Sequence, residues 1–146
     1  HGVLMLPDNI DVADPNTVDM VLTFRNIHNW MARGQERIAI KAFYDMLKPG
    51  GILGVVEHRG DESVPQDPAS KSGYVNESYM VQIAKEAGFI LDASSEINAN
   101  SLDAKKHAEG VWTLAPPSRA QDDEPRKELS KIGESDRFTL RFKKPL

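Results

Sequence analysis

VDMVLTFRNIHNW, residues 18–30, joins a nearly continuous apolar run to a cluster of polar side chains. The run at 18–24 is rich in apolar and β-branched residues, the pattern of a strand covered on both faces in a parallel sheet. The next six residues, 25–30, supply an arginine, two asparagines, a histidine and a tryptophan. Open α/β sheets place their binding sites at the carboxyl ends of parallel strands. We therefore predict a central parallel strand with a binding site at its end.

A second apolar run follows one helical segment later. Apolar residues recur at three- and four-residue intervals over 35–47, which predicts an amphipathic helix facing a core. The turn at 48–51, KPGG, ends that helix because proline cannot continue it and glycine accepts positive φ. Residues 52–57 again have the pattern of a strand buried on both faces. Strand, helix and strand form a right-handed βαβ unit, so we predict an α/β fold.

The next part of the chain predicts a loop, a helix and a third strand. Residues 60–73 are polar, rich in proline, serine and aspartate, and without periodicity, which predicts a mobile loop. Asn76 is suited to cap the following helix, and Gly88 to end it. Residues 89–97 then have the composition of a third strand, less hydrophobic than the first two.

The carboxyl end predicts a strand of a different kind. Residues 98–136 are polar and interrupted by prolines, and GVWTL at 110–114 fits either a short strand or an anchor. Apolar and polar residues alternate strictly over 137–143. That alternation predicts a strand, most simply an antiparallel one, with one face in solvent. We treat 98–136 as an insertion before this last strand.

Composition bounds the possible functions. The chain has 146 residues, 40% hydrophobic and 27% charged, as is ordinary for one soluble domain. Its formal net charge of -4 and the lack of a long basic tract argue against a nucleic-acid partner. The lack of cysteine excludes disulfides and thiolate chemistry. No apolar stretch approaches the roughly 20 residues that span a bilayer, and no signal peptide is visible, so we expect a cytoplasmic protein without a membrane partner.

Six segments occur in a distinctive order: VDMVLTFRNIHNW, MLKPGGILGVVEHRG, GYVNESYMVQIAKEAGFIL, SSEINAN, GVWTL and IGESDRFTLRFKKP. Together they resemble the second half of class I S-adenosylmethionine-dependent methyltransferases, and more narrowly a bacterial group of predicted methyltransferases. The resemblance covers nearly the whole chain. It implies a Rossmann-like sheet in which 18–24, 52–57, 89–97 and 137–143 are the fourth, fifth, sixth and antiparallel seventh strands. It also implies S-adenosylmethionine as cofactor and methyl transfer to a small-molecule acceptor.

Half of the family's cofactor site cannot be placed on this chain. The family has a glycine-rich turn after its first strand and an acidic residue ending its second, and neither is found. Gly50, Gly51 and Gly54 precede a strand instead of following one, so we interpret them as a turn. The chain begins at His1 rather than methionine, and we expect 1–146 to be a partial methyltransferase domain whose activity is incomplete alone. The resemblance assigns cofactor contacts to Asp8, Asn9 and Phe24.

The polar residues after 18–24 suit acceptor binding and catalysis. His28 is suited to act as general base or to orient a substrate, or else it hydrogen-bonds the loop into shape. Arg25 is suited to bind a carboxylate through its planar fork, or it is simply solvated. Asn26 and Asn29 lie where some family members hold a target amine, although asparagine is also a common turn residue. Trp30 either walls the substrate pocket or belongs to the core.

A second polar cluster follows 52–56 and is expected at the same sheet edge. We assign catalytic roles to Glu57 and His58, together with His28 and Asn29. Arg59 is a substrate-binding candidate, with an ion pair to Asp61 or Glu62 as the structural alternative. The four histidines do not fall at metal-ligand spacing, so the sequence predicts no metal site. The segments that either close this pocket or act as loop scaffolding are Asn98, Asn100, Trp112 and the GESD stretch at 133–136.

The sequence also allows functions other than methyl transfer. If the strand at 18–24 lacks a neighbour, its bare edge invites pairing, so the alternative to an enzyme is a noncatalytic module that dimerises or binds a partner. We accordingly expect a homodimer or strand-exchanged assembly. For the enzyme, the loop at 60–73 is a candidate lid. A serine hydrolase using His28 or His58 is disfavoured because no serine lies on a Gly-x-Ser-x-Gly elbow.

Overall fold

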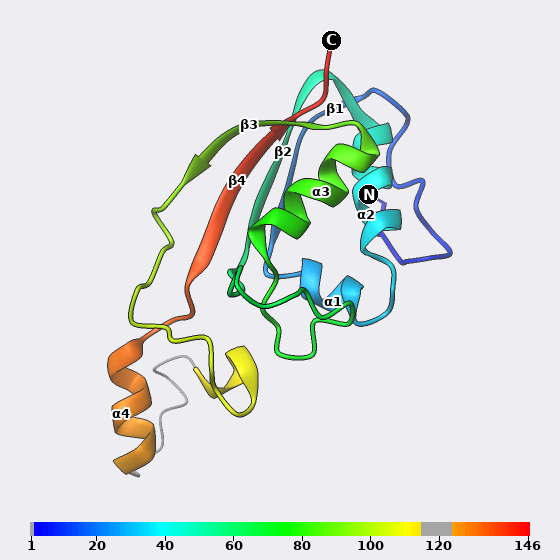
Figure 1. Ribbon diagram of the computed structural model, residues 1–146. Helices are drawn as coiled ribbons and strands as arrows, with labels where there is room; N and C mark the ends of the chain where they lie inside the picture. The colour runs from blue at the N-terminus through cyan, green and yellow to red at the C-terminus, as the bar shows by residue number, and fades with distance from the viewer. Residues whose placement is uncertain (1, 115–123) are drawn as a thin grey trace.

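The computed structural model describes residues 2–114 and 124–146 and contains one open four-stranded sheet (Figure 1). Its spatial order is β1-β2-β4-β3. β1 and β2 run parallel, whereas β4 is antiparallel to both of its neighbours. The strands are β1 (Val18–Phe24), β2 (Leu47–His58), β3 (Ile90–Ser95) and β4 (Arg137–Lys143). The predicted α/β class, the parallel pair and the antiparallel last strand are confirmed: the sheet is part of a Rossmann-like fold.

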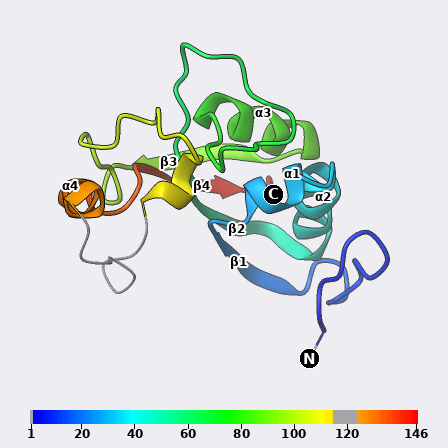
Figure 2. The same cartoon turned by 90° about the horizontal axis from the view of Figure 1, so that it is seen from below.

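Three helices cover one face of this sheet (Figure 2). They are α1 (Ile27–Met31), α2 (Glu36–Met46) and α3 (Glu77–Ala87). The core lies between these helices and the sheet because every second residue of β2 and β4 points toward them. The buried residues that pack there are Ile40, Phe43, Met46, Leu53, Val55, Met80, Ile83, Phe138, Leu140 and Phe142.

The helix ends mostly follow their sequence signals. α2 ends at Met46, but β2 begins directly at Leu47, so the turn predicted at 48–51 is instead an irregular start of this strand, in which Gly50 has φ of 78°. Gly88 ends α3 with φ of 107°, the left-handed geometry that glycine accepts best. Asn76 occupies the cap position of α3, but its side-chain amide donates to the carbonyl of Val64 instead of accepting from the helix. The predicted side-chain cap is therefore wrong.

The opposite face of the sheet is bare among the described residues, which corrects the expectation that 18–24 and 52–57 are covered on both faces. Met20, Leu22 and Phe24 are 53%, 56% and 59% exposed. On the same side, Ile52 and Val56 of β2 are only half-buried. The apolar pattern is that of a doubly covered strand, yet all three covering helices pack on one side. This bare face lines a shallow apolar depression of about 320 Å³.

Two further helices lie in the segment predicted as an insertion. η1 (Gly110–Thr113) is a short 3-10 helix, so GVWTL forms an anchor and not a strand. α4 (Glu124–Ile132) was not predicted, and neither was α1. None of the helices in the described ranges is both long and apolar enough to span a membrane.

Candidate functional site

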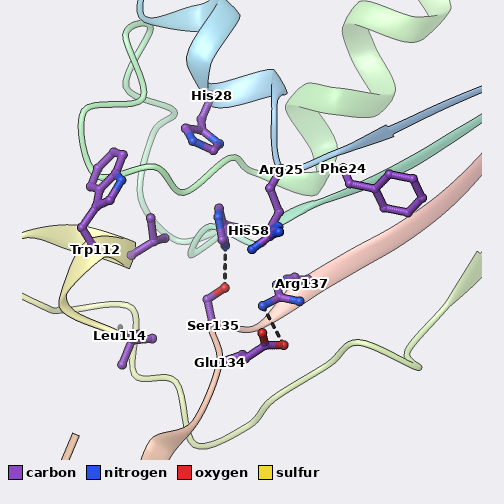
Figure 3. Close-up of a pocket in the computed structure, with 10 residues that line it drawn as sticks. Phe24, Arg25, His28, His58, Trp112, Leu114, Glu134, Ser135 and Arg137 are labelled. Carbon is purple, nitrogen blue, oxygen red and sulfur yellow. Dashed lines mark hydrogen bonds and ion pairs between the residues drawn. The ribbon is translucent and has the colours of Figure 1, made fainter. Parts of the chain in front are cut away.

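A pocket of about 320 Å³ opens where β1 and β2 end (Figure 3). Four segments far apart in the sequence supply its wall: the end of β1 with α1, the end of β2, η1, and the start of β4. Its lining residues are Phe24, Arg25, His28, His58, Val111, Trp112, Leu114, Glu134, Ser135 and Arg137. The polar residues at the ends of β1 and β2 therefore line the same pocket, since parallel strands end at the same sheet edge.

Glu57 forms the floor beside this pocket and is fully buried. Alternation along β2 places Glu57, like Val55, on the face that the helices cover. Its Oε2 accepts a hydrogen bond from the backbone N–H of His28 at 3.1 Å. Its Oε1 lies 3.1 Å from His28 Nδ1 and accepts from the backbone N–H of His58 at 2.8 Å. Three nitrogen contacts thus compensate for burying a carboxylate, and they orient His28.

His58 stands between the two sides of the pocket (Figure 3). Its Nδ1 is hydrogen-bonded to Ser135 Oγ at 2.5 Å, and its ring centroid lies 5.3 Å from that of His28. Burial lowers the pKa of His58 to about 4, although the charge of Glu57 opposes the shift. The imidazole is therefore neutral near pH 7, and its Nε2 makes no hydrogen bond with the described residues.

Two arginines give the pocket positive charge. Arg25 has φ of 52°, a left-handed conformation that turns the chain from β1 toward α1. Its guanidinium makes no hydrogen bond or ion pair with the described residues and reaches toward His58 (Figure 3). Arg137 Nη2 pairs with Glu134 Oε2 at 2.8 Å, while its buried Nε has no partner in the described chain. The pocket thus favours a ligand that carries negative charge or hydrogen-bond acceptors.

An aromatic wall completes the site. Trp112 of η1 meets the ring of His28 edge-on, with 5.9 Å between centroids. It is 55% exposed, so its indole presents a large face to the pocket opening. An indole in this position suits a planar or apolar ligand.

A buried carboxylate holds this wall in place. Asp103 accepts hydrogen bonds from the Tyr74 hydroxyl, from the backbone N–H groups of Lys105 and Asp136, and lies 2.9 Å from His107 Nε2. Burial opposes ionisation of Asp103, but these contacts outweigh it and keep its pKa below the ordinary value. Burial, with the Asp103 contact, raises the pKa of Tyr74 well above its usual range. The cluster fixes the segment before β4 against the loop that carries η1.

The other residues proposed from the sequence lie outside the pocket lining. Asn29 donates to Asn26 Oδ1 at 3.1 Å, which stabilises the turn into α1. Trp30 packs edge-on against Phe43 of α2, with centroids 5.6 Å apart, and so lies half-buried against the core.

Arg59 pairs with neither Asp61 nor Glu62, which corrects that expectation. Its Nη2 donates to Glu96 Oε2 at 2.7 Å, and its Nε lies 3.6 Å from Glu77 Oε2 and 4.0 Å from Asp136 Oδ2. β2 continues straight through His58 and carries the guanidinium toward α3 and β4 instead of back over its own loop.

The amino-terminal cofactor candidates lie apart from the pocket. Asp8 and Asn9 are exposed, and the Asn9 side chain donates to the carbonyl of Val3. Phe24 is the cofactor candidate that does line the pocket, at its border with the bare sheet face.

The sequence did not identify several residues of the pocket wall individually. Ser135, within the GESD stretch, and Trp112 were named only as possible pocket-closing elements, and Arg137 was named only as the start of a strand. The one available signal was that GVWTL and IGESDRFTLRF occurred in the ordered set of segments. Of the remaining candidates, Asn98 donates to Thr139 Oγ1 and Asn100 donates to the carbonyls of 132 and 134, so both act as scaffolding.

Comparison with solved structures shows which known folds this sheet resembles. The [4+2]-cyclase SpnF superimposes with a TM-score of 0.61 and 18% identity, over 92% of this chain and 53% of SpnF. A SAM-dependent methyltransferase from Methanosarcina mazei gives a TM-score of 0.57 at 12% identity, over 91% of this chain and 62% of that one. The chain has a methyltransferase-type fold.

A third solved structure holds ligands. Burkholderia thailandensis 1,6-didemethyltoxoflavin-N1-methyltransferase, with bound 1,6-didemethyltoxoflavin and S-adenosylhomocysteine, gives a TM-score of 0.55 at 12% identity, over 94% of this chain and 48% of its own. The chain thus spans between 48% and 62% of the length of these three proteins. No protein-family model and no curated protein matches the sequence. SpnF is a cyclase, so the methyltransferase fold also carries other chemistry.

Proposed function

We propose that this chain forms the acceptor-binding half of an S-adenosylmethionine-dependent methyltransferase that acts on a small molecule. The observation that carries this proposal is the polar pocket at the shared carboxyl ends of β1 and β2, on a sheet with the methyltransferase fold. Its volume of about 320 Å³ suits a small acceptor and not a polymer.

Different pocket residues are proposed to hold different parts of the acceptor. Arg25 and Arg137 bind its anionic or acceptor-rich part, and Trp112 packs against its apolar face. His28 and His58 contact the atom that receives the methyl group, with Glu57 as the positioning residue for His28. Methyl transfer depends mainly on holding two reactants in line in a site that excludes water. Roles in substrate binding for Asn26, Trp30 and Arg59, and a catalytic role for Asn29, stay predictions. None of the four residues lines the pocket.

The described residues fit only part of a cofactor site. They contain no glycine-rich turn that follows a strand and opens a helix, which is what cradles such a cofactor. Phe24 borders both the pocket and the bare face, and it is the cofactor candidate that would contact S-adenosylmethionine next to the acceptor. When bound, the cofactor supplies the methyl group. Contacts from Asp8 and Asn9 stay a prediction.

The loop at 60–73 contacts the η1 part of the pocket wall. The carbonyl of Ser72 accepts a hydrogen bond from the backbone N–H of Val111 at 2.9 Å. None of the lining residues belongs to this loop, so its role as a lid stays a prediction.

The test is transfer of a labelled methyl group from S-adenosylmethionine into a fraction of small metabolites by the protein that carries this chain. We expect Arg25→Ala and Trp112→Ala to lower the labelling at least tenfold, through a raised KM for the acceptor. Arg33→Ala is the matched control, because Arg33 is an exposed arginine outside the pocket. Equal labelling by all variants would contradict the placement of the acceptor, and no labelling by any form would contradict methyl transfer.

A noncatalytic module is the second candidate, favoured by the bare apolar face. β1 has one partner strand in the described chain, so one of its edges is unpaired. Together with exposed Met20, Leu22 and Phe24, that edge offers a surface for a second copy or a partner protein. Sedimentation of the wild type and of Leu22→Glu tests this candidate.

A further inference from the structure

Two histidines and a glutamate converge at the inner wall of the pocket. His28, Glu57 and His58 each offer one ligand atom, and these three atoms all lie within 4.8 Å of one another. We propose that His28, Glu57 and His58 bind a divalent first-row transition-metal ion. The ion would lie at the pocket wall, with its remaining coordination positions open to the bound acceptor.

The distances are close to those of a metal site. Ligand atoms bonded to one ion at about 2.0–2.2 Å lie about 2.8–3.6 Å apart when adjacent and about 4.0–4.4 Å apart when opposite. Glu57 Oε1 lies 3.1 Å from His28 Nδ1 and 4.0 Å from His58 Nε2. A small rotation of the two rings therefore brings all three atoms into coordination range. The hydrogen bond between His28 Nδ1 and Glu57 is then replaced by bonds from both to the ion, and the ring proton moves from Nδ1 to Nε2 by exchange with solvent, so that the imidazole stays neutral.

The surroundings of the three residues resemble the outer shell of a metal site. A metal-bound histidine usually makes a hydrogen bond through its other ring nitrogen, which fixes the ring. His58 does so through Nδ1, which is bonded to Ser135 Oγ, and this leaves Nε2 directed to the cluster. Glu57 is held by the backbone N–H groups of His28 and His58. Oε1 of Glu57 makes two contacts: the bond from the His58 N–H is kept, and the contact with His28 Nδ1 is the one that the ion replaces.

The donor set selects the class of ion. Two imidazole nitrogens and one carboxylate favour Zn²⁺, Fe²⁺, Mn²⁺ or Co²⁺ over Mg²⁺ and Ca²⁺, which prefer oxygen ligands. Three protein ligands leave positions open, as in catalytic sites. Both histidines line the pocket while Glu57 lies behind them, so the open positions face the acceptor.

The proposed ion also indicates the chemical class of the methyl acceptor. An ion at this wall would bind a hydroxyl oxygen of the acceptor and favour its deprotonated form, which is the better nucleophile, with the proton released to solvent. Arg25 adds positive charge on the same side. An oxygen acceptor, such as a phenol or hydroxy acid, fits this arrangement. That second step rests on the proposed methyl transfer, whereas binding of the ion does not.

The sequence spacing conceals such a site. His28 and Glu57 are 29 positions apart, and Glu57 and His58 are adjacent residues of a strand. Neighbouring residues of a strand usually point to opposite faces, so they do not form a recognisable ligand motif. At the end of β2 both side chains are nevertheless buried near α1, and the prediction of no metal rested on spacing alone.

The experiment is a titration of the metal-free full chain with Co²⁺, followed by visible absorption, with no cofactor or acceptor present. We expect one equivalent to bind with d–d bands typical of nitrogen and oxygen ligands, and Zn²⁺ to displace it. Mg²⁺ is expected not to compete. His28→Ala and His58→Ala are expected to weaken binding at least about 100-fold, and Ser135→Ala about tenfold, as outer-shell changes do.

The controls separate this site from other histidines and from misfolding. His107→Ala removes a histidine that contacts Asp103 outside the cluster, and its Co²⁺ affinity is expected to match that of the wild type. Circular dichroism reports whether each variant is folded, and Ser135→Ala keeps the test decisive if a ligand variant is not. Absence of the d–d bands in the wild type, or equal affinity in folded His58→Ala, would overturn the metal site. Neither result bears on methyl transfer, which is measured separately.

Discussion

Glu57 at the end of β2 accepts a hydrogen bond from the backbone N–H of His28, 29 residues earlier, at 3.1 Å. This contact fixes the start of α1 against the adjacent strand. It takes the place of a side-chain cap, since the N-cap residue Asn26 makes no capping hydrogen bond. One buried carboxylate thus sets both the geometry of α1 and the orientation of an imidazole in the pocket.

Glu57→Gln is expected to destabilise the fold by about 2–4 kcal/mol, since an amide leaves a buried donor facing N–H groups. Urea unfolding measures the change. Glu128→Gln is the matched control: Glu128 makes an exposed ion pair with Lys131, and its loss is expected to cost less than about 1 kcal/mol. Equal destabilisation by the two substitutions would show that Glu57 is not the link between β2 and α1.

Asp103→Asn is expected to cost about 2–4 kcal/mol, because four donor groups converge on this buried carboxylate. The control is Asp45→Asn, which weakens only an exposed pair with Lys41 within α2. Tryptophan fluorescence should also change in Asp103→Asn, since Trp112 lies on the segment that Asp103 holds. An unchanged unfolding midpoint would contradict this role.

Asp103 also predicts a pH dependence of stability. Its pKa is lowered in the folded state, so the unfolded state binds the proton more readily and the ionised carboxylate stabilises the fold. That contribution is present above the ordinary value of about 3.9 and is lost as the pH falls through the lower folded value. In urea unfolding measured from neutral to acid pH, the midpoint concentration should begin to decrease once the pH drops below about 5. The fall should be shallower in Asp103→Asn, and an identical slope would contradict the assignment.

Lys144 and Lys143 form a matched pair on either side of the end of β4. Lys144 is buried, and its Nζ donates to Asn16 Oδ1 and to the carbonyls of Tyr44 and Leu47. Lys144→Met is expected to cost about 2–3 kcal/mol, because these acceptors lose their donor, whereas exposed Lys143→Met should cost less than about 0.5 kcal/mol. Chemical unfolding of both variants checks the difference. Similar costs would mean that the buried amine contributes nothing specific.

The bare face of β1 predicts self-association of the isolated chain. We expect sedimentation velocity at high concentration to show a dimer or larger assembly, through the unpaired edge and the exposed side chains of Met20, Leu22 and Phe24. Leu22→Glu places a charge in this patch and should yield a monomer. Ile97→Glu, at an exposed apolar residue outside the patch, should leave the assembly unchanged. A monodisperse monomer for the wild type would contradict the prediction.

The strand ends were the most informative part of the sequence for the site. Arg25, His28 and His58 were predicted to share one sheet edge, and all three line one pocket. That inference depends only on two parallel strands ending together. Trp112, Ser135 and Arg137 escaped specific assignment because they reach the pocket through long-range contacts, such as the bond between Ser135 and His58 and the cluster around Asp103.

The sequence by itself determined the periodic elements: apolar runs for β1 and β2, helical spacing for α2 and α3, and alternation for β4. These follow from local backbone geometry, which nearby residues specify. Only the tertiary structure decided that one face of the sheet is bare, that Arg59 pairs with Glu96, and that Glu57 lies between two histidines. Such outcomes depend on which distant segments pack together, and packing has no fixed spacing along the chain.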